Sequence, residues 1–365
     1  MSTDLVVIGG GPVGLATALY AVRVGLSVVV LEPRAGVVDK ACGEGLMPGA
    51  LAGLQDLGVD PAGHVIAGIR YVSGPRSVTA DFAAAPGRGV RRTVLHTALR
   101  EAVDRAGVEV VETAMVGLDQ DATGVTVQIS SRTGALRAGY AVGADGLHSP
   151  TRRMVGLTAR PAGRRRHGLR QHYRVPPWSD HVQVHWGARA EAYVTPVSDE
   201  TVGVAVLTGD RGPMAAHHTE FEELSTRLAG AQVVSAVRGS GPLRQRATSR
   251  AAGRVLLVGD AGGYVDALTG EGLALGLSQA QAAVDAVSAG RPERYPAVAA
   301  RAGLASTTLT HGLLTATGTP AGRRVLLGAA HRSPWLFGRA VRTLARTGPR
   351  TGDTASVRPV PGEAI

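Results

Sequence analysis

The chain has 365 residues, of which 44% are hydrophobic, and a formal net charge of +10. This length allows a cofactor-binding domain with a substantial insertion, and the composition is sufficient for a large core. No stretch approaches the ~20 apolar residues of a membrane helix. The first apolar run begins near residue 4, which leaves no room for a signal peptide, so a cytoplasmic protein is expected.

Two residue types occur only once. Cys42 is the only cysteine, which excludes an internal disulfide and a multi-cysteine metal site, and no metal is expected. Lys40 is the only lysine, and asparagine is absent, a pattern typical of GC-rich genomes. We therefore interpret the positive charge mainly as codon bias. It favours anionic small molecules by steering, and a nucleic-acid partner is not expected.

A glycine-rich turn near the N-terminus predicts a dinucleotide site. An apolar run at residues 5–8 leads into the motif Gly9-x-Gly11-x-x-Gly14, then a helical pattern, then a second apolar run that ends in Glu32. The first glycine allows the turn, the second lets the backbone approach a pyrophosphate, and the third lets helix pack on strand. Glu32 stands where a ribose hydroxyl needs an acceptor.

The next elements, in chain order, alternate between helices and strands. The segment from Lys40 to Pro48 is expected to be an irregular loop, because it contains glycine and proline without apolar periodicity. Helices are predicted over 50–57 and from Arg92 to Gly107, where leucines recur at helical spacing. The predicted strands are 66–72, 77–82, 108–111, 125–129 and 140–144.

The second half of the chain has a different pattern. Short strands are predicted at 169–175, 181–186, 191–197 and 201–207, which indicates an inserted antiparallel sheet of roughly four strands. A helix over 221–228, a buried strand at 254–258 and a long helix over 270–289 follow. Residues from 296 onward are predicted to be helical and arginine-rich, and the last fifteen or so are expected to be a disordered tail.

Three glycine–acid junctions each follow a predicted strand. They are the motif ending at Gly14 with Glu32, Asp145-Gly146, and Gly259-Asp260. Because ligands of open α/β sheets bind at the carboxyl ends of the strands, the three junctions are expected to meet at one extended cofactor.

At this point the chain resembles the FAD-dependent superfamily of para-hydroxybenzoate hydroxylase-type monooxygenases and geranylgeranyl reductases. The motifs are the glycine turn with Glu32, the segment from Gly143 to Arg152, and the segment from Gly259 to Gly272. The resemblance implies an α/β fold, with a Rossmann-like FAD-binding domain, an inserted antiparallel-sheet substrate domain and C-terminal helices. It also implies FAD as the cofactor, with NADPH or NADH as a transient electron donor.

The resemblance further implies roles for single residues. Glu32 is expected at the adenosine ribose, Arg92 near the phosphates, Asp260 at the ribityl chain, and the start of the helix at Gly270 near the flavin ring. The full set of residues expected at the cofactor is Gly9, Gly11, Pro12, Gly14, Glu32, Arg34, Lys40, Ala41, Cys42, Arg92, Asp145, Gly146, Asp260, Gly270, Glu271 and Gly272.

The substrate pocket is expected between the flavin and the inserted sheet. Cys42 lies in a segment that resembles the Cys-Gly-rich loop of geranylgeranyl reductase-like proteins. Tyr193, Thr195 and Pro196 match a family strand that faces the substrate. Alternation places His181, Gln183 and His185 on one face of their strand and Val182, Val184 and Trp186 on the other, and the sequence does not decide which face meets the pocket.

The expected domain boundaries follow from these motifs. A discontinuous FAD-binding domain comprises 1–65, 90–156 and 246–295, and the substrate domain comprises 66–89 and 157–245. A C-terminal helical segment covers 296–350, and 351–365 is the tail.

The sequence allows three functions. The first, which the sequence favours over the other two, is a monooxygenase that uses NAD(P)H and dioxygen to hydroxylate an aromatic or polyketide-like small molecule of secondary metabolism through a flavin hydroperoxide. The second is a reductase of prenyl or other double bonds, indicated by Cys42-Gly43 and by Gly263, where hydroxylases often have histidine. The third is a basic flavoprotein whose arginine-rich C-terminal helices contact nucleic acid or a membrane surface. The sequence does not define the oligomeric state.

Overall fold

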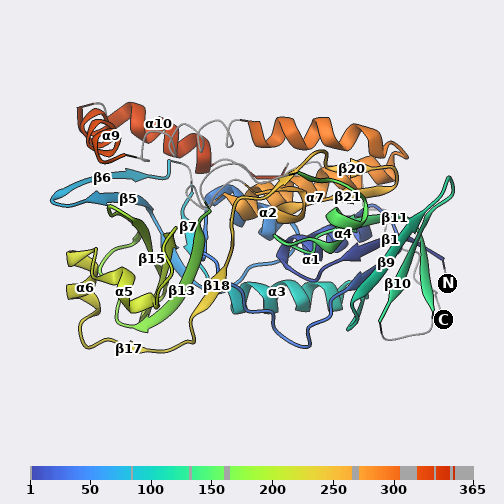
Figure 1. Cartoon of the computed structure of the whole chain (residues 1–365), viewed down its shortest axis with the longest axis horizontal. Helices are drawn as coiled ribbons and strands as arrows, with labels where there is room; N and C mark the ends of the chain where they lie inside the picture. Colours follow the sequence, from blue (N-terminus) through green and yellow to red (C-terminus); the bar gives the residue numbers. More distant parts are fainter. Residues whose placement is uncertain are drawn as a thin grey trace, which may run out of the picture.

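The computed structural model describes residues 2–83, 85–130, 134–159, 165–264, 271–304, 319–332, 334–345 and 348–349. Gly270 and the tail expected at 351–365 lie outside these residues. The described part contains two large sheets at opposite ends of an elongated molecule, with helices between and around them (Figure 1).

The first sheet has the order β20-β21-β11-β1-β2-β8. Its middle strands pair in parallel, and β9 and β10 extend β11 as antiparallel neighbours. The strands are β1 (Ser2–Ile8), β2 (Val28–Leu31), β8 (Glu109–Val111), β9 (Met115–Gln120), β10 (Val125–Ile129), β11 (Ala135–Gly143), β20 (Ala251–Ala252) and β21 (Val255–Leu257). The strand β9 was not predicted from the sequence, because its side chains alternate only weakly between buried and exposed.

Alternation along β1 explains how both faces of this sheet are covered. Leu5 and Val7 pack against helices, whereas Val6 and Ile8 pack against β9, β10 and their neighbours. All four side chains are almost completely buried. The helices on the first face are α1 (Pro12–Arg23), α2 (Pro48–Asp56), α3 (Arg92–Arg105) and α7 (Gly272–Ser288). The parallel strands therefore form a buried layer whose carboxyl ends face the rest of the molecule.

The second sheet has the order β17-β13-β16-β15-β14-β5-β6, and β18 also pairs with β13. Its strands are β5 (Gly68–Ser73), β6 (Arg76–Asp81), β13 (His167–Arg174), β14 (His181–Trp186), β15 (Ala190–Ser198), β16 (Thr201–Thr208), β17 (Gln232–Val233) and β18 (Arg238–Ser240). The expected sheet of roughly four antiparallel strands is thus too small. The β5–β6 hairpin joins its edge, and β5 pairs with β14 in parallel because it arrives from a distant part of the chain.

Smaller elements connect the two sheets. A three-stranded sheet contains β3 (Gly45–Leu46), β4 (His64–Ile66) and β7 (Gly87–Gly89), so part of the expected irregular loop is a strand paired with β7. The remaining elements are β12 (Thr158–Ala159), β19 (Arg246–Ala247), α4 (Pro150–Met154), α5 (Met214–His218), α6 (Glu222–Leu228), η1 (Gly259–Gly262), η2 (Pro292–Arg294), α9 (Pro320–Arg332) and α10 (Pro334–Ala345). Residues 295–304 are also helical.

The two faces of the second sheet have different neighbours. Val182, Val184 and Trp186 belong to an apolar cluster that includes Met47 and Leu147 from the first half of the molecule. The opposite face, with Val194 and Val204, packs against α5 and α6. Alternation did not decide which face of β14 is turned toward the cofactor-binding half. In the structure, the face with Trp186 is turned toward the first sheet.

Within the described ranges, no helix combines the length and the apolar character needed to cross a bilayer.

Candidate functional site

The glycine turn between β1 and α1 has the geometry that its sequence predicts. Gly9 has a φ of +111°, and a Cβ on Gly14 would lie 1.9 Å from the carbonyl oxygen of Gly9. Larger residues are therefore excluded at both positions. A Cβ on Gly11, by contrast, would have only Arg92 within 4 Å, with Nη2 at 3.9 Å. Pro12 begins the helix, so the space beside Gly11 lies at a helix N-terminus with free amide groups.

Arg92 places an unpaired cation next to this turn. It is the first residue of α3, and only 7% of its surface is exposed. Among the described residues, its Nη1 atom has no hydrogen-bond partner. Burial lowers the pKa of the guanidinium, because the structure offers this charge little compensation. A buried arginine beside a helix N-terminus fits an anion such as a pyrophosphate.

His96 lies one turn further along α3 and was missed by the sequence analysis. Its Nε2 lies 3.0 Å from the carbonyl oxygen of Gly10, and its Nδ1 accepts a bond from the backbone of Val38. Burial lowers the pKa of His96, so the neutral ring is favoured. The available signal was its helical spacing from Arg92, which puts both side chains on one face of α3.

Glu32 lies at the end of β2, as expected for a ribose acceptor, but its carboxylate is already occupied. It accepts bonds from the backbone of Gly10 and Arg34 and from both sides of the Arg34 guanidinium. Burial raises the pKa of Glu32, and these bonds more than offset that effect, so the pKa is lowered. A carboxylate offers about four acceptor positions. A ribose hydroxyl can therefore bind Glu32 only if Arg34, which is exposed, releases one of them.

Lys40 lies between two of the three glycine–acid junctions, Asp145-Gly146 and Gly259-Asp260. Its Nζ lies 3.6 Å from the carboxylate of Asp260 and would lie 3.4 Å from a Cβ on Gly146. Asp145 uses one oxygen to accept bonds from Thr151. Among the described residues, the other oxygen of Asp145 is buried without a partner. The sequence-predicted residues at 40, 145, 146 and 260 thus converge at one edge of the first sheet.

The loop that follows carries Cys42 toward the second sheet. Gly43 accepts a 2.8 Å bond from the Thr195 hydroxyl on β15. Cys42 is exposed, and Ala41 is partly exposed beside it. Surrounding protein atoms nevertheless raise the pKa of the Cys42 thiol; Arg92 opposes this rise and Glu44 adds to it.

Glu44 is a buried residue that interacts with both α3 and β13, and no sequence pattern indicated this role. It adopts a φ of +62°, and its carboxylate accepts a 2.9 Å bond from the backbone of Arg92, which caps the N-terminus of α3. Its other oxygen lies 2.7 Å from Nε2 of His172 on β13. Arg170, also on β13, forms ion pairs with Glu44 and Asp39. A charged network therefore fixes the 39–44 loop to the second sheet. Sequence could not show it, because the two acids are more than a hundred residues away from Arg170 and His172.

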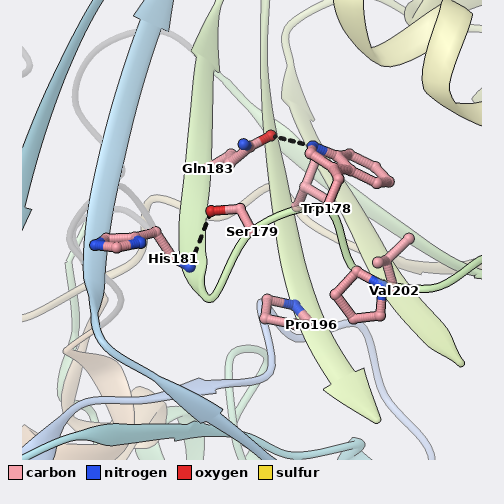
Figure 2. A pocket seen from close by; sticks show the side chains of 8 residues that line it. Trp178, Ser179, His181, Gln183, Pro196 and Val202 are labelled. Carbon is pink, nitrogen blue, oxygen red and sulfur yellow. Dashed lines mark hydrogen bonds between the residues drawn. The ribbon is translucent and has the colours of Figure 1, made fainter. Parts of the chain in front are cut away.

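The expected pocket residues on β15 do not share one face. Tyr193 belongs to the apolar cluster that is turned toward the first sheet, and Thr195 bonds the 39–44 loop. Pro196 instead lines a cavity of about 10 Å³ on the other face, together with Trp178 and Gln183 (Figure 2). This cavity has room for about one water molecule. Pro196 therefore does not share a face with Tyr193 and Thr195, because adjacent strand residues point in opposite directions.

The start of α7 lies close to the same region. Glu271 is buried at the N-cap position, and Gly272 is the first helical residue. Burial raises the pKa of Tyr71 on β5, and the charges of Glu271 and Glu191 add to this rise. Glu271 therefore lies near the second sheet. Gly270, expected to begin this helix, is outside the described residues.

A parallel sheet with a glycine turn, a buried arginine and further acids at the same edge is typical of proteins that bind a dinucleotide cofactor such as FAD. The residues present fit the cofactor, because the open space at Gly11 and the unpaired Nη1 of Arg92 both suit its phosphates. The chain belongs to the FAD binding domain family, which matches residues 2–289.

Comparison with known proteins gives relatives of two kinds. The chain is 28% identical to digeranylgeranylglycerophospholipid reductase 1 of Methanothermobacter thermautotrophicus, over 79% of this chain and 78% of that protein. It is 32% identical to 3-(3-hydroxy-phenyl)propionate/3-hydroxycinnamic acid hydroxylase of Mycobacterium avium, over 43% of this chain and 31% of that protein. The match to the reductase therefore extends over both sheets, whereas the match to the hydroxylase is partial.

Among solved structures, p-nitrophenol 4-monooxygenase of Pseudomonas putida superposes with a TM-score of 0.80 at 21% identity. The alignment covers 96% of this chain and 99% of that one. This likeness confirms the predicted fold, an FAD-binding α/β unit combined with a second sheet.

Proposed function

We propose that the protein is an FAD-dependent reductase that saturates a carbon–carbon double bond of an isoprenoid-type substrate, with NADPH or NADH as electron donor. The observation that carries this proposal is the accessible thiol of Cys42 in the loop between the Lys40–Asp260 pair and Thr195. The relative that matches over most of the chain is also named as a reductase.

The residues around the glycine turn would hold the cofactor. Arg92 and the N-terminus of α1 would bind its phosphates, Glu32 its ribose, and Asp260 with Lys40 the chain that leads to the flavin. When bound and reduced, FAD supplies hydride-transfer chemistry. The remaining steps belong to the protein.

Saturation of a double bond adds a hydride to one carbon and a proton to the other. Cys42 would provide the proton from Sγ as a general acid. Desolvation by the surrounding protein raises the pKa of this thiol, so the proton is present before transfer. The resulting thiolate recovers a proton from solvent, to which the side chain is accessible. Thr195 holds the loop by its bond to Gly43, and the apolar cluster that contains Tyr193 and Trp186 would supply a wall suited to an isoprenoid chain.

The test is anaerobic turnover of FAD-loaded protein with NAD(P)H and a geranylgeranyl lipid, followed by mass spectrometry. Each saturated bond adds two hydrogens, and in heavy water at least the one that arrives as a proton is deuterium. Cys42→Ala is expected to lower the rate about 10²–10⁴-fold, while the FAD content and the flavin spectrum stay as in the wild type. Equal rates for Cys42→Ala and the wild type would contradict the proton-donor role.

Hydroxylation is the second candidate, favoured by the relative that is 32% identical over part of the chain. It predicts that a phenolic substrate accelerates oxygen consumption with NAD(P)H. The same FAD-loaded preparation therefore separates the two functions: oxygen uptake that depends on a phenol, with no reduction of prenyl lipids, would replace our proposal.

A further inference from the structure

The positive charge of the chain is concentrated in one segment. Residues 294–351 contain nine arginines and no acidic residue, whereas the rest of the chain has 30 Lys+Arg and 29 Asp+Glu. A genomic preference for arginine codons does not explain this distribution, because it would not remove acids from one segment only. The interpretation of the charge as codon bias therefore needs correction for this part of the chain.

The helices α9 and α10 present part of this segment at one end of the molecule, where they pack on β6 (Figure 1). Gly338, Val341 and Ala345 form the buried face of α10. Val341 belongs to the same apolar cluster as Trp186 and Tyr193. The inner face of α10 thus contacts the wall that we assign to the substrate region.

The outer faces of the two helices combine apolar and basic side chains. Val325 on α9 and Trp335 on α10 are 70% and 67% exposed. Arg332 and Arg339 are exposed on the same two helices. We call these four residues the α9–α10 surface. A helix pair with exposed tryptophan and aliphatic side chains among arginines has the composition of an interfacial, membrane-bound element.

We propose that the α9–α10 surface docks on an anionic lipid bilayer. The arginines complement acidic headgroups, and Trp335 and Val325 enter the boundary between headgroups and acyl chains. These apolar side chains favour a bilayer over nucleic acid, because a phosphate backbone offers them no apolar phase. Docking would place the bilayer one helix away from the cluster of Val341 and Tyr193.

This proposal does not depend on the reaction catalysed, and its test involves no turnover. FAD-loaded protein is mixed with phosphatidylcholine vesicles, with or without about a third phosphatidylglycerol, over a range of salt concentrations. We expect binding to the anionic vesicles only, weakened by salt, with a blue shift of the Trp335 emission. Arg332→Gln with Arg339→Gln should weaken binding about 25-fold, and Trp335→Ser should weaken it and abolish the blue shift.

The matched control is Arg105→Gln with Arg174→Gln, which removes the same charge from exposed positions on α3 and β13. Two outcomes would overturn the proposal: no binding to anionic vesicles, or equal weakening by the two arginine pairs, which would mean that net charge alone drives association. Binding of a labelled DNA duplex without vesicle binding would assign the surface to nucleic acid instead. Circular dichroism spectra equal to the wild type show that each variant is folded.

Discussion

At the scale of single residues, unsatisfied buried groups are the most informative feature of the site. Arg92 has an unpartnered Nη1, and Asp145 has an unpartnered carboxylate oxygen, within the described part of the chain. Leaving a buried polar group unpaired costs about 1–3 kcal/mol, and more for a charged group. A bound ligand that forms hydrogen bonds with these two groups would remove this cost, which explains why they lie unpaired beside the glycine turn.

Arg92→Met is therefore expected to weaken FAD binding about 10- to 100-fold, since a bond from a charged donor contributes about 1.5–3 kcal/mol. The measurement is titration of the apoprotein with FAD, followed by flavin fluorescence. Arg100→Met, which removes a surface arginine from the same helix, is the control and should bind FAD as the wild type does. Unchanged affinity in Arg92→Met would remove Arg92 from the site.

Lys40 offers a second probe, because it is the only lysine of the chain. An amine-reactive reagent can modify it and the terminal amine only. We expect FAD to slow the modification of Lys40 but not of the terminus, as quantified by mass spectrometry of peptides. If FAD protects neither amine, the cofactor does not lie near the Lys40–Asp260 pair.

His96 predicts how stability depends on pH. Its pKa in the folded protein is lowered, chiefly by burial, with a contribution from Arg92 that the bond to Gly10 and the charge of Glu32 oppose. Below the unfolded value of about 6.5, the unfolded chain binds more protons, so the free energy of unfolding falls as pH falls.

The measurement is urea unfolding between pH 8 and 5. His96→Gln should show a shallower loss of stability than the wild type over this range, because glutamine does not titrate. His148→Gln, at an exposed position, is the control. Parallel profiles for the wild type and His96→Gln would show that His96 does not contribute.

At the scale of elements, the β1–α1 unit separates glycines needed for folding from a glycine needed for binding. A Cβ on Gly14 meets backbone at 1.9 Å, which no side-chain movement can relieve, whereas a Cβ on Gly11 makes only an ordinary contact with Nη2 of Arg92 at 3.9 Å. Gly14 is therefore required for packing and Gly11 for cofactor binding. In the sequence, both appear simply as glycines of one motif.

Gly14→Ala is expected to destabilise the apoprotein by about 3 kcal/mol or more. Gly11→Ala should change the stability of the apoprotein by no more than about 0.5 kcal/mol, yet weaken FAD binding at least about tenfold. Urea unfolding and FAD titration of both variants provide the comparison. Equal effects of the two substitutions on stability, or unchanged FAD binding in Gly11→Ala, would contradict this division.

At the scale of the whole molecule, the charged network of Asp39, Glu44, Arg170 and His172 joins the two sheets. Arg170 is 1% exposed and carries the ion pairs across the boundary. Removing one partner of a buried pair leaves an uncompensated charge, at a cost of about 3–5 kcal/mol. The network therefore couples the loop that carries Lys40 and Cys42 to the sheet that carries Thr195.

Arg170→Met is expected to uncouple the two sheets. In the wild type, urea unfolding followed by circular dichroism and by tryptophan fluorescence should coincide, because Trp178 and Trp186 report on the second sheet and the dichroism on the whole chain. In Arg170→Met, the fluorescence transition should come at lower urea. Coincident transitions in the variant would show that the apolar contacts alone keep the molecule cooperative.

The sequence by itself determined the β1–α1–β2 unit, the α3 helix and the convergence of three glycine–acid junctions. These depend on local periodicity and on the rule that parallel strands present their carboxyl ends at one edge. Only the tertiary structure decided which face of β14 meets the first sheet. It also decided that Pro196 points away from Tyr193 and that Arg34 forms hydrogen bonds with the carboxylate of Glu32. It also revealed Glu44 and His96, whose partners are distant in sequence. Such contacts depend on how separate elements pack, which no local pattern of residues records.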